Sequence, residues 1–200
     1  IVLQQFLLGG PVMVPLLLLS IAVAAVGVDR LRFWRRLGSP TDRRWRLVEN
    51  QLLEGSSPTG VPTSSPVGHL MRQLTAADGP AARQLELQLI LQSQAAAMAR
   101  GERILEAAAA LGPLLGLLGT VTGLIRTFAA LGREVGSASM DRVALGISEV
   151  LVSTATGILV ALFAMVVLKI NMAYRSSYLA LLERLALSFE RNTHQLVCRG

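Results

Sequence analysis

Three long apolar segments dominate the hydrophobic pattern of this chain. They cover residues 12–28, 104–125 and 143–168, and a membrane-spanning helix requires about 20 mostly apolar residues. No charged residue precedes Asp29. A cleaved signal peptide is the alternative for the first segment, but basic residues are missing ahead of it and two further apolar segments follow. We therefore predict three transmembrane helices, the first within residues 1–28 after a short interfacial helix.

The segment between the first and second spans predicts a helical domain over residues 29–103. A helix with Ser39 as its N-cap is expected to stop at Gly55. Residues 55–68 are rich in glycine, serine and proline, which is typical of a linker. A second short helix is expected over residues 69–77.

The second and third spans are expected to continue beyond the membrane as long helices. No helix breaker separates Pro80 from Gly101 ahead of the second span, and apolar residues keep a helical spacing from Tyr178 to Phe189 after the third. The two helices would run antiparallel over about 50 residues, roughly 75 Å each. The predicted fold class is an all-α integral membrane protein with three transmembrane helices, two of them extended into a cytoplasmic helical bundle.

Basic residues predict the orientation of the chain in the membrane. Residues 29–103 carry eleven arginines, and residues 169–200 carry one lysine and four arginines. The connection over residues 126–142 carries only three basic residues. Because cytoplasmic loops are enriched in arginine and lysine, we place residues 29–103 and 169–200 in the cytoplasm. The N-terminus and residues 126–142 then face outward.

The composition agrees with a membrane protein and disfavours other classes. Charged residues make up 16% of the chain, whereas a soluble domain averages about 25%. The net charge of +6 is explained by membrane orientation without a nucleic-acid partner. The single cysteine, Cys198, excludes an internal disulfide, and the two histidines are too sparse for a metal site. No nucleophile elbow or phosphate loop occurs, so we expect no enzymatic activity, no catalytic residues and no cofactor.

Small residues occupy one face of the second span. Gly112, Gly116, Gly119 and Gly123 are spaced four, three and four residues apart, which places them on one side of a helix. In lipid, helices associate through close packing and hydrogen bonds. We predict that this face packs on another helix, either in the same chain or in a neighbouring copy. Pro113 allows a kink within the span.

Polar residues lie in the outer third of the second and third spans. Thr120 and Glu149 lie about 8 Å and about 9 Å from the outer ends of their spans. An ionised carboxylate inside a span costs roughly 2.5–3.5 kcal/mol, so it normally faces a protein interior or a watery cavity. Glu149 shares a helix face with Ser153 and Thr156, whereas Thr154 lies about 140° away. Glu149 is a candidate for ion movement, unless it reaches interfacial water or stays protonated as an inert donor.

Three stretches of the sequence resemble a known family. They are "GGPVMVPLLLLSIAVAAVGVDRLRFW", "LGPLLGLLGTVTGLIRTF" and "GISEVLVSTATGILVALFAMVV", which in order and spacing resemble the ExbB/TolQ/MotA proton-channel family. The resemblance is closest to the three-span ExbB and TolQ branch. MotA-type stators usually carry four spans, which counts against a flagellar role. Asp29 is a mild departure, since the family often has glutamate there.

The resemblance implies a function, partners and site residues. Such proteins form homopentamers around a dimer of a single-span ExbD/TolR-type partner in the bacterial inner membrane. They pass protons inward and drive a TonB- or TolA-like protein for outer-membrane import or envelope maintenance. The partner carries the proton-binding aspartate, and the resemblance assigns Thr120, Thr154 and Glu149 to the proton pathway that faces it. The implied coupling ion is the proton, although threonine-lined sites can also serve sodium.

Two other function classes stay open on the residues alone. A structural membrane scaffold without ion transport would tolerate apolar replacements of Glu149 and Thr154. A self-contained ion channel would need an ionisable relay across the membrane. Glu149 is the one acid well inside a span, since Glu106 lies within three residues of the cytoplasmic end of the second span. We therefore favour a channel subunit that works with a partner and with membrane lipids. Its N-terminus is expected to be periplasmic and its C-terminus cytoplasmic.

Overall fold

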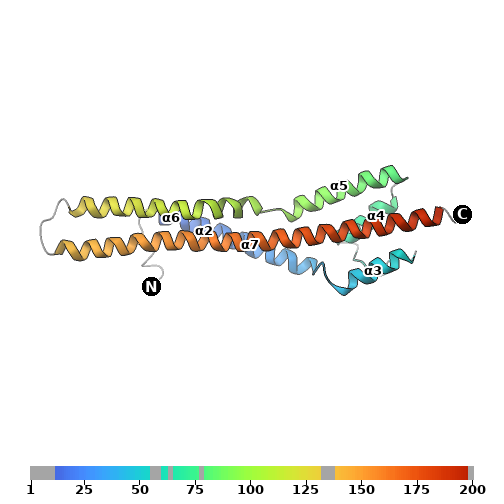
Figure 1. Ribbon diagram of the computed structural model, residues 1–200, viewed down its shortest axis with the longest axis horizontal. Helices are drawn as coiled ribbons and strands as arrows, with labels where there is room; N and C mark the ends of the chain where they lie inside the picture. The colour runs from blue at the N-terminus through green and yellow to red at the C-terminus, as the bar shows by residue number, and fades with distance from the viewer. Residues whose placement is uncertain (1–11, 55–59, 63–64, 77–78, 132–137, 198–200) are drawn as a thin grey trace. The chain divides into compact units, whose positions relative to one another are not determined.

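The chain is all-helical within the residues that its structure describes. The computed structural model describes residues 12–54, 60–62, 65–76, 79–131 and 138–197, and no strand occurs in these ranges. The predicted all-α fold class is confirmed. The helices in chain order (Figure 1) are α2 Met13–Leu37, α3 Arg43–Leu53, α4 Pro66–Ala76, α5 Pro80–Met98, α6 Glu102–Leu131 and α7 Ala138–Val197.

Three of these helices are long and apolar enough to cross a membrane. Their most apolar windows have mean hydropathies of 1.9 in α2, 1.8 in α6 and 2.5 in α7. α7 has 60 residues and would measure about 90 Å if straight. Because the hydrocarbon core of a bilayer is about 30 Å thick, only part of α7 can lie in it. The chain is a multi-pass membrane protein, as the apolar pattern predicted.

The helices divide into two compact units. The membrane unit contains the described residues of Ile1–Asp29 and Gly101–Lys169, and the polar unit contains those of Arg30–Arg100 and Ile170–Gly200. α2 and α7 therefore contribute to both units. Asp29 and Lys169 are the first charged residues after the first and third apolar segments, so two of the boundaries lie where a helix can leave the hydrocarbon.

The polar unit has a hydrophobic core built from amphipathic helix faces. α3 buries Trp45, Val48 and Leu52, whose spacing places them on one side of the helix. α4 and the end of α7 bury apolar residues with similar spacing. The buried residues of this core are Trp34, Trp45, Val48, Leu52, Val67, Leu70, Met71, Leu74, Ile90, Met98, Tyr178, Leu181, Leu182, Leu185 and Ala186.

The N-cap predicted for the first helix of the polar unit is wrong. Asp42, and not Ser39, caps α3, because its carboxylate accepts a hydrogen bond from the backbone N–H of Arg44 at 3.3 Å. The Nε of Arg44 donates to the same carboxylate at 2.9 Å, and this side-chain hydrogen bond lowers the pKa of Asp42. A charged acceptor makes a stronger cap than the Ser39 hydroxyl, which pairs with Thr41. The predicted stop at Gly55 lies outside the described residues.

α4 begins earlier than the predicted start at His69. Ser65 Oγ accepts a hydrogen bond from the backbone N–H of Gly68 at 3.1 Å, and Pro66 occupies the first position of the helix. A serine cap followed by proline is a strong start signal for a helix. The last residues of the segment predicted as a linker therefore belong to a helix.

The helix predicted to run from Pro80 into the second span is interrupted. α5 ends at Met98 and α6 begins at Glu102. Between them, Gly101 adopts a φ of 84°, a left-handed conformation that favours glycine. A Cβ atom at Gly101 would also lie 2.8 Å from Cγ1 of Val26. The composition of this segment favours helix throughout, but Gly101 fixes a break.

A buried hydrogen-bond network joins α2, α5 and α7 in the polar unit. Asn171 is 1% exposed. Its Oδ1 accepts a hydrogen bond from Nε1 of Trp34 at 2.8 Å, and its Nδ2 donates to the carbonyl of Met98 at 3.1 Å. Arg30 donates to the same carbonyl at 3.4 Å, which places a positive charge at the C-terminus of α5. The network therefore satisfies polar groups that burial would otherwise leave without partners.

Asn171→Leu should destabilise the polar unit, whereas Tyr178→Phe should not. The first change leaves the buried N–H of Trp34 without its acceptor, at a cost of about 1–3 kcal/mol. The Tyr178 hydroxyl is buried and has no hydrogen-bond partner among the described residues, so its removal should leave stability unchanged or raise it. Thermal unfolding in detergent, followed by circular dichroism, measures the contrast. Equal losses in the two variants would contradict it.

Candidate functional site: the interface between α6 and α7

Backbone contact joins α6 and α7 in the membrane unit. A Cβ atom added to Gly112 would lie 2.8 Å from the carbonyl oxygen of Gly157, and one added to Gly116 would lie 3.0 Å from Cα of Thr154. These obstacles are backbone atoms, which cannot rotate out of the way as a side chain can. Glycine is therefore required at both positions for the helices to approach this closely.

The other two glycines of the same face meet side chains of α7. Gly119 lies against Ser153, and Gly123 lies against Val150. The sequence left open whether this face packs within the chain or on a neighbouring copy, and the structure places α7 of the same chain against it. Pro113 is half-buried inside α6, which continues through it.

Thr154 forms a hydrogen bond between the two helices. Its Oγ1 donates to the carbonyl oxygen of Gly116 at 3.1 Å. Interhelical hydrogen bonds of this kind contribute roughly 0.6–2 kcal/mol to association in a membrane. A side chain at position 116 would push Thr154 away from this carbonyl, so the hydrogen bond depends on the glycine.

α2 covers one edge of the α6–α7 interface. A Cβ atom at Gly119 would lie 3.8 Å from Val12, which directly precedes α2, and one at Gly27 of α2 would lie 3.9 Å from Phe163 of α7. Thr154 precedes Phe163 by nine residues, which turns it about 180° around α7 from that contact. Thr154 therefore lies on the edge of the interface that faces away from α2.

Thr120 lies on the same edge. Viewed along α6, Gly119 on the α2 side lies about 60° to one side of Gly116, and Thr120 lies about 40° to the other side. Thr120 and Thr154 are both half-buried. We call this edge, with its two threonines, the open edge. It can receive another helix without displacing α2.

The two threonine oxygens present acceptor lone pairs along the open edge. Each hydroxyl donates its proton to a backbone carbonyl. Thr154 donates to the carbonyl of Gly116, and Thr120 donates to the carbonyl of Leu117 at 2.6 Å. A hydroxyl has one proton and two lone pairs, so each oxygen can still accept a hydrogen bond. Such acceptors suit a protonated carboxyl group or a water molecule better than a carboxylate.

Glu149 is the third residue that the sequence assigned to the proton pathway. It lies within α7, and its side chain lies outside the described residues. The structure therefore brings together two of the three predicted residues.

One turn beyond Glu149 along α7, Ser153 is 1% exposed, and its hydroxyl has no hydrogen-bond partner among the described residues. The sequence does not predict the contact between Ser153 and Gly119. Helical spacing shows which residues share a face of one helix, but it does not show how two helices are rotated against each other.

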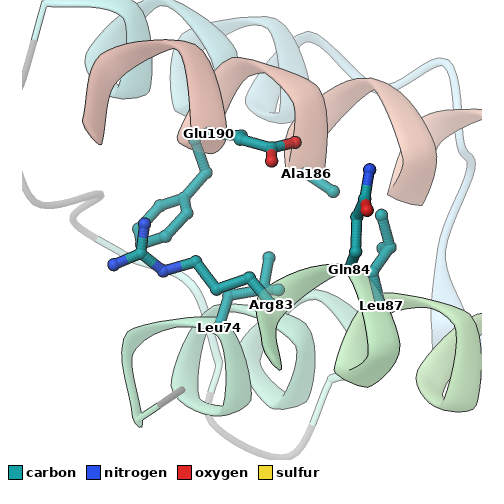
Figure 2. A pocket seen from close by; sticks show the side chains of 7 residues that line it. Leu74, Arg83, Gln84, Leu87, Ala186 and Glu190 are labelled. Atoms are coloured by element: carbon teal, nitrogen blue, oxygen red, sulfur yellow. The ribbon is translucent and has the colours of Figure 1, made fainter. Parts of the chain in front are cut away.

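The described residues offer little other chemistry. A small cavity, partly open to solvent, lies in the polar unit and is lined by residues of α4, α5 and α7 (Figure 2). Arg83 and Glu190 reach it from opposite helices, and its walls are mainly apolar. It shares no residue with the open edge. Over the same described ranges, no group of three or more His, Cys, Asp or Glu residues could hold a metal ion.

The amino-acid sequence of this chain is similar to those of known transport proteins. Residues 64–183, which include the whole α6–α7 interface, match the MotA/TolQ/ExbB proton channel family. A biopolymer transport protein named ExbB-like 1 from Synechocystis sp. is 38% identical over 87% of this chain and 72% of its own length. The ExbB-like 3 protein of the same organism is 32% identical over 86% of this chain and 83% of its own length. The biopolymer transport protein exbB1 of Vibrio cholerae is 39% identical over 36% of this chain and 31% of its own length.

Gly116→Ala should weaken the packing of α6 on α7, whereas Gly27→Ala should not. At Gly116 the new methyl group meets the Cα and carbonyl oxygen of Thr154 at 3.0 and 3.2 Å, and at Gly27 it meets Val167 at 3.8 Å, an ordinary contact. We expect a loss of about 1–3 kcal/mol for Gly116→Ala and little change or a gain for Gly27→Ala, since alanine favours helix. Unfolding in mixed detergent micelles measures both. A Gly116→Ala variant as stable as the wild type would contradict the backbone contact.

Proposed function

The chain belongs to the MotA/TolQ/ExbB proton channel family, and on this basis we propose that it is the ExbB-like channel subunit of a bacterial inner-membrane motor. Five copies surround two copies of a single-span ExbD/TolR-type partner, whose helix carries the proton-binding aspartate. Protons pass inward, and the motor does mechanical work on a TonB- or TolA-like protein for outer-membrane import or envelope maintenance. Residues 29–103 and 169–200 are cytoplasmic in this arrangement, and residues 126–142 are periplasmic.

The open edge is the observation that supports this proposal most directly. A partner helix that docks there meets Thr120 and Thr154, because α2 covers the opposite edge of the interface. Lipid offers no hydrogen-bond partner to a carboxyl group at this depth, and a buried polar group without a partner costs several kcal/mol. The two threonine oxygens supply such partners.

Protonation controls how well the partner's aspartate fits the open edge. A protonated carboxyl donates its O–H to a threonine oxygen whose own proton is bound to the carbonyl of Gly116 or Leu117. A carboxylate has no proton to donate, so it is bound only if the threonine gives up its backbone hydrogen bond. The edge therefore favours the neutral acid. Proton binding and release then change the affinity of the partner helix for this edge, which makes transport stepwise.

Glu149 sets the electrostatics of the entry in this proposal. It precedes Thr154 by five residues, about 8 Å along α7 towards the predicted outer side. A carboxylate near the entry attracts cations out of the aqueous phase. Because Glu149 is turned about 140° around α7 from Thr154, it acts in this proposal through its charge near the entry, whereas the partner's aspartate binds at Thr120 and Thr154.

Thr120→Val and Thr154→Val should each lower proton flux about 10- to 100-fold, which corresponds to the loss of one hydrogen bond to a polar group in a dry site. Thr122→Val is the matched control. Thr122 also lies on α6 and donates to its own helix, to the Leu118 carbonyl at 2.8 Å, but it is turned about 160° away from Thr120. Flux is measured with a pH-sensitive dye in vesicles that contain this chain and its partner.

Two further variants test the hydroxyl of Thr154 and the charge of Glu149 separately. Thr154→Ser keeps the hydroxyl and should keep most of the proton flux. Glu149→Ala removes the charge at the entry and should lower the proton flux. Wild-type flux in both Thr154→Val and Glu149→Ala would overturn the residue assignment and favour a structural membrane scaffold. Flux that requires sodium in the outer solution would identify sodium rather than the proton as the coupling ion.

A further inference from the structure

The exposed side of α2 changes from apolar residues to arginines along one continuous helical stripe. α2 is an unbroken helix over Met13–Leu37, so its own register fixes which residues share a side. The apolar members are between 41% and 63% exposed, and the arginines that follow are exposed as well. The stripe consists of Val14, Leu17, Leu18, Ile21 and Val28, followed by Arg32, Arg35 and Arg36.

Among the described residues these three arginines have no hydrogen-bond or ion-pair partner, whereas Arg30, Arg44 and Arg184 each have one. Arg30, on the opposite side of α2, is 5% exposed and donates to the carbonyl of Met98. Arg44 pairs with Asp42, and Arg184 of α7 pairs with Glu49. The three arginines of the stripe form no hydrogen bond or ion pair with any residue that the structure describes. Their charges therefore stay available to an external anion.

The position of the arginines along α2 matches the headgroup layer of a membrane. Val28 is the last apolar residue of the stripe before them. At 1.5 Å per residue, Arg32 lies about 6 Å beyond Val28 and Arg36 about 12 Å beyond it. The headgroup layer adds roughly 5–8 Å on each side of the hydrocarbon core, and long arginine side chains reach back towards it.

We propose that Arg32, Arg35 and Arg36 form a binding site for the headgroup phosphates of anionic phospholipids. Guanidinium groups bind phosphate oxygens through two parallel hydrogen bonds, which a lysine cannot form. Leu31, which is 59% exposed, and Val28 contact the acyl chains beside them. The site involves neither the open edge nor the partner's aspartate. It therefore goes beyond the proposed function and does not depend on it.

The test compares two triple variants that remove the same charge. Arg32→Gln/Arg35→Gln/Arg36→Gln removes the site, and Arg43→Gln/Arg46→Gln/Arg191→Gln removes three exposed arginines elsewhere. Native mass spectrometry of the full chain in detergent measures binding of phosphatidylglycerol and of phosphatidylcholine. The wild type should prefer phosphatidylglycerol. The first variant should lose roughly a hundredfold in affinity for it, since each arginine near an anionic surface contributes about fivefold, and the control should keep it.

Several outcomes would contradict the proposed phospholipid site. Equal losses in the two variants would show an effect of net charge alone, and equal wild-type binding of the two lipids would show no anionic preference. Displacement of the lipid by millimolar inorganic phosphate would identify a simple anion site instead. If a second copy of the chain covers the stripe, the wild type retains no phosphatidylglycerol. Should the triple variant fail to fold, the three single glutamine variants are each expected to lose about fivefold, and unchanged affinity in all three contradicts the proposal.

Discussion

The close backbone approach of α6 and α7 is the constraint on which the rest of the membrane unit depends. Gly112 and Gly116 bring the two backbones together, and the hydrogen bond from Thr154 to the Gly116 carbonyl becomes possible only at that separation. The same contact commits the hydroxyl proton of Thr154 and leaves its lone pairs on the open edge. In the proposed function, a packing feature of the fold thus determines which protonation state of the partner's carboxyl group the edge accepts.

The two units are stabilised by different physics. In the membrane unit, apolar side chains gain little by leaving lipid, so contact depends on small residues and interhelical hydrogen bonds. In the polar unit, large apolar side chains such as Trp45 and Leu70 are buried away from water. Asn171 and Arg30 satisfy the buried polar groups there. α2 takes part in both environments, and we propose that the arginines on its exposed side meet a third one, the headgroup layer.

The sequence predicted the features that depend on periodicity and missed those that depend on a single contact. Apolar segments long enough to span a bilayer are sufficient to predict three spans and an all-α fold. The break between α5 and α6 was missed because it depends on the conformation of Gly101 and on its contact with Val26. The cap of α3 was assigned to Ser39 because propensity alone cannot reveal that Arg44 supports Asp42. Tertiary contacts decide these cases.

The sequence suggests which residues form the candidate site, but it does not reveal how they are arranged. Spacing places the four glycines on one face, and the resemblance to the family identifies Thr120 and Thr154. That both threonines lie on the edge away from α2, with their protons bound to backbone carbonyls, follows from how three helices rotate against one another. The most direct test of the account is native mass spectrometry of the purified chain, alone and co-expressed with the proposed single-span partner. The account predicts a pentamer that gains two copies of the partner, and a stable monomer or dimer in both preparations would contradict it.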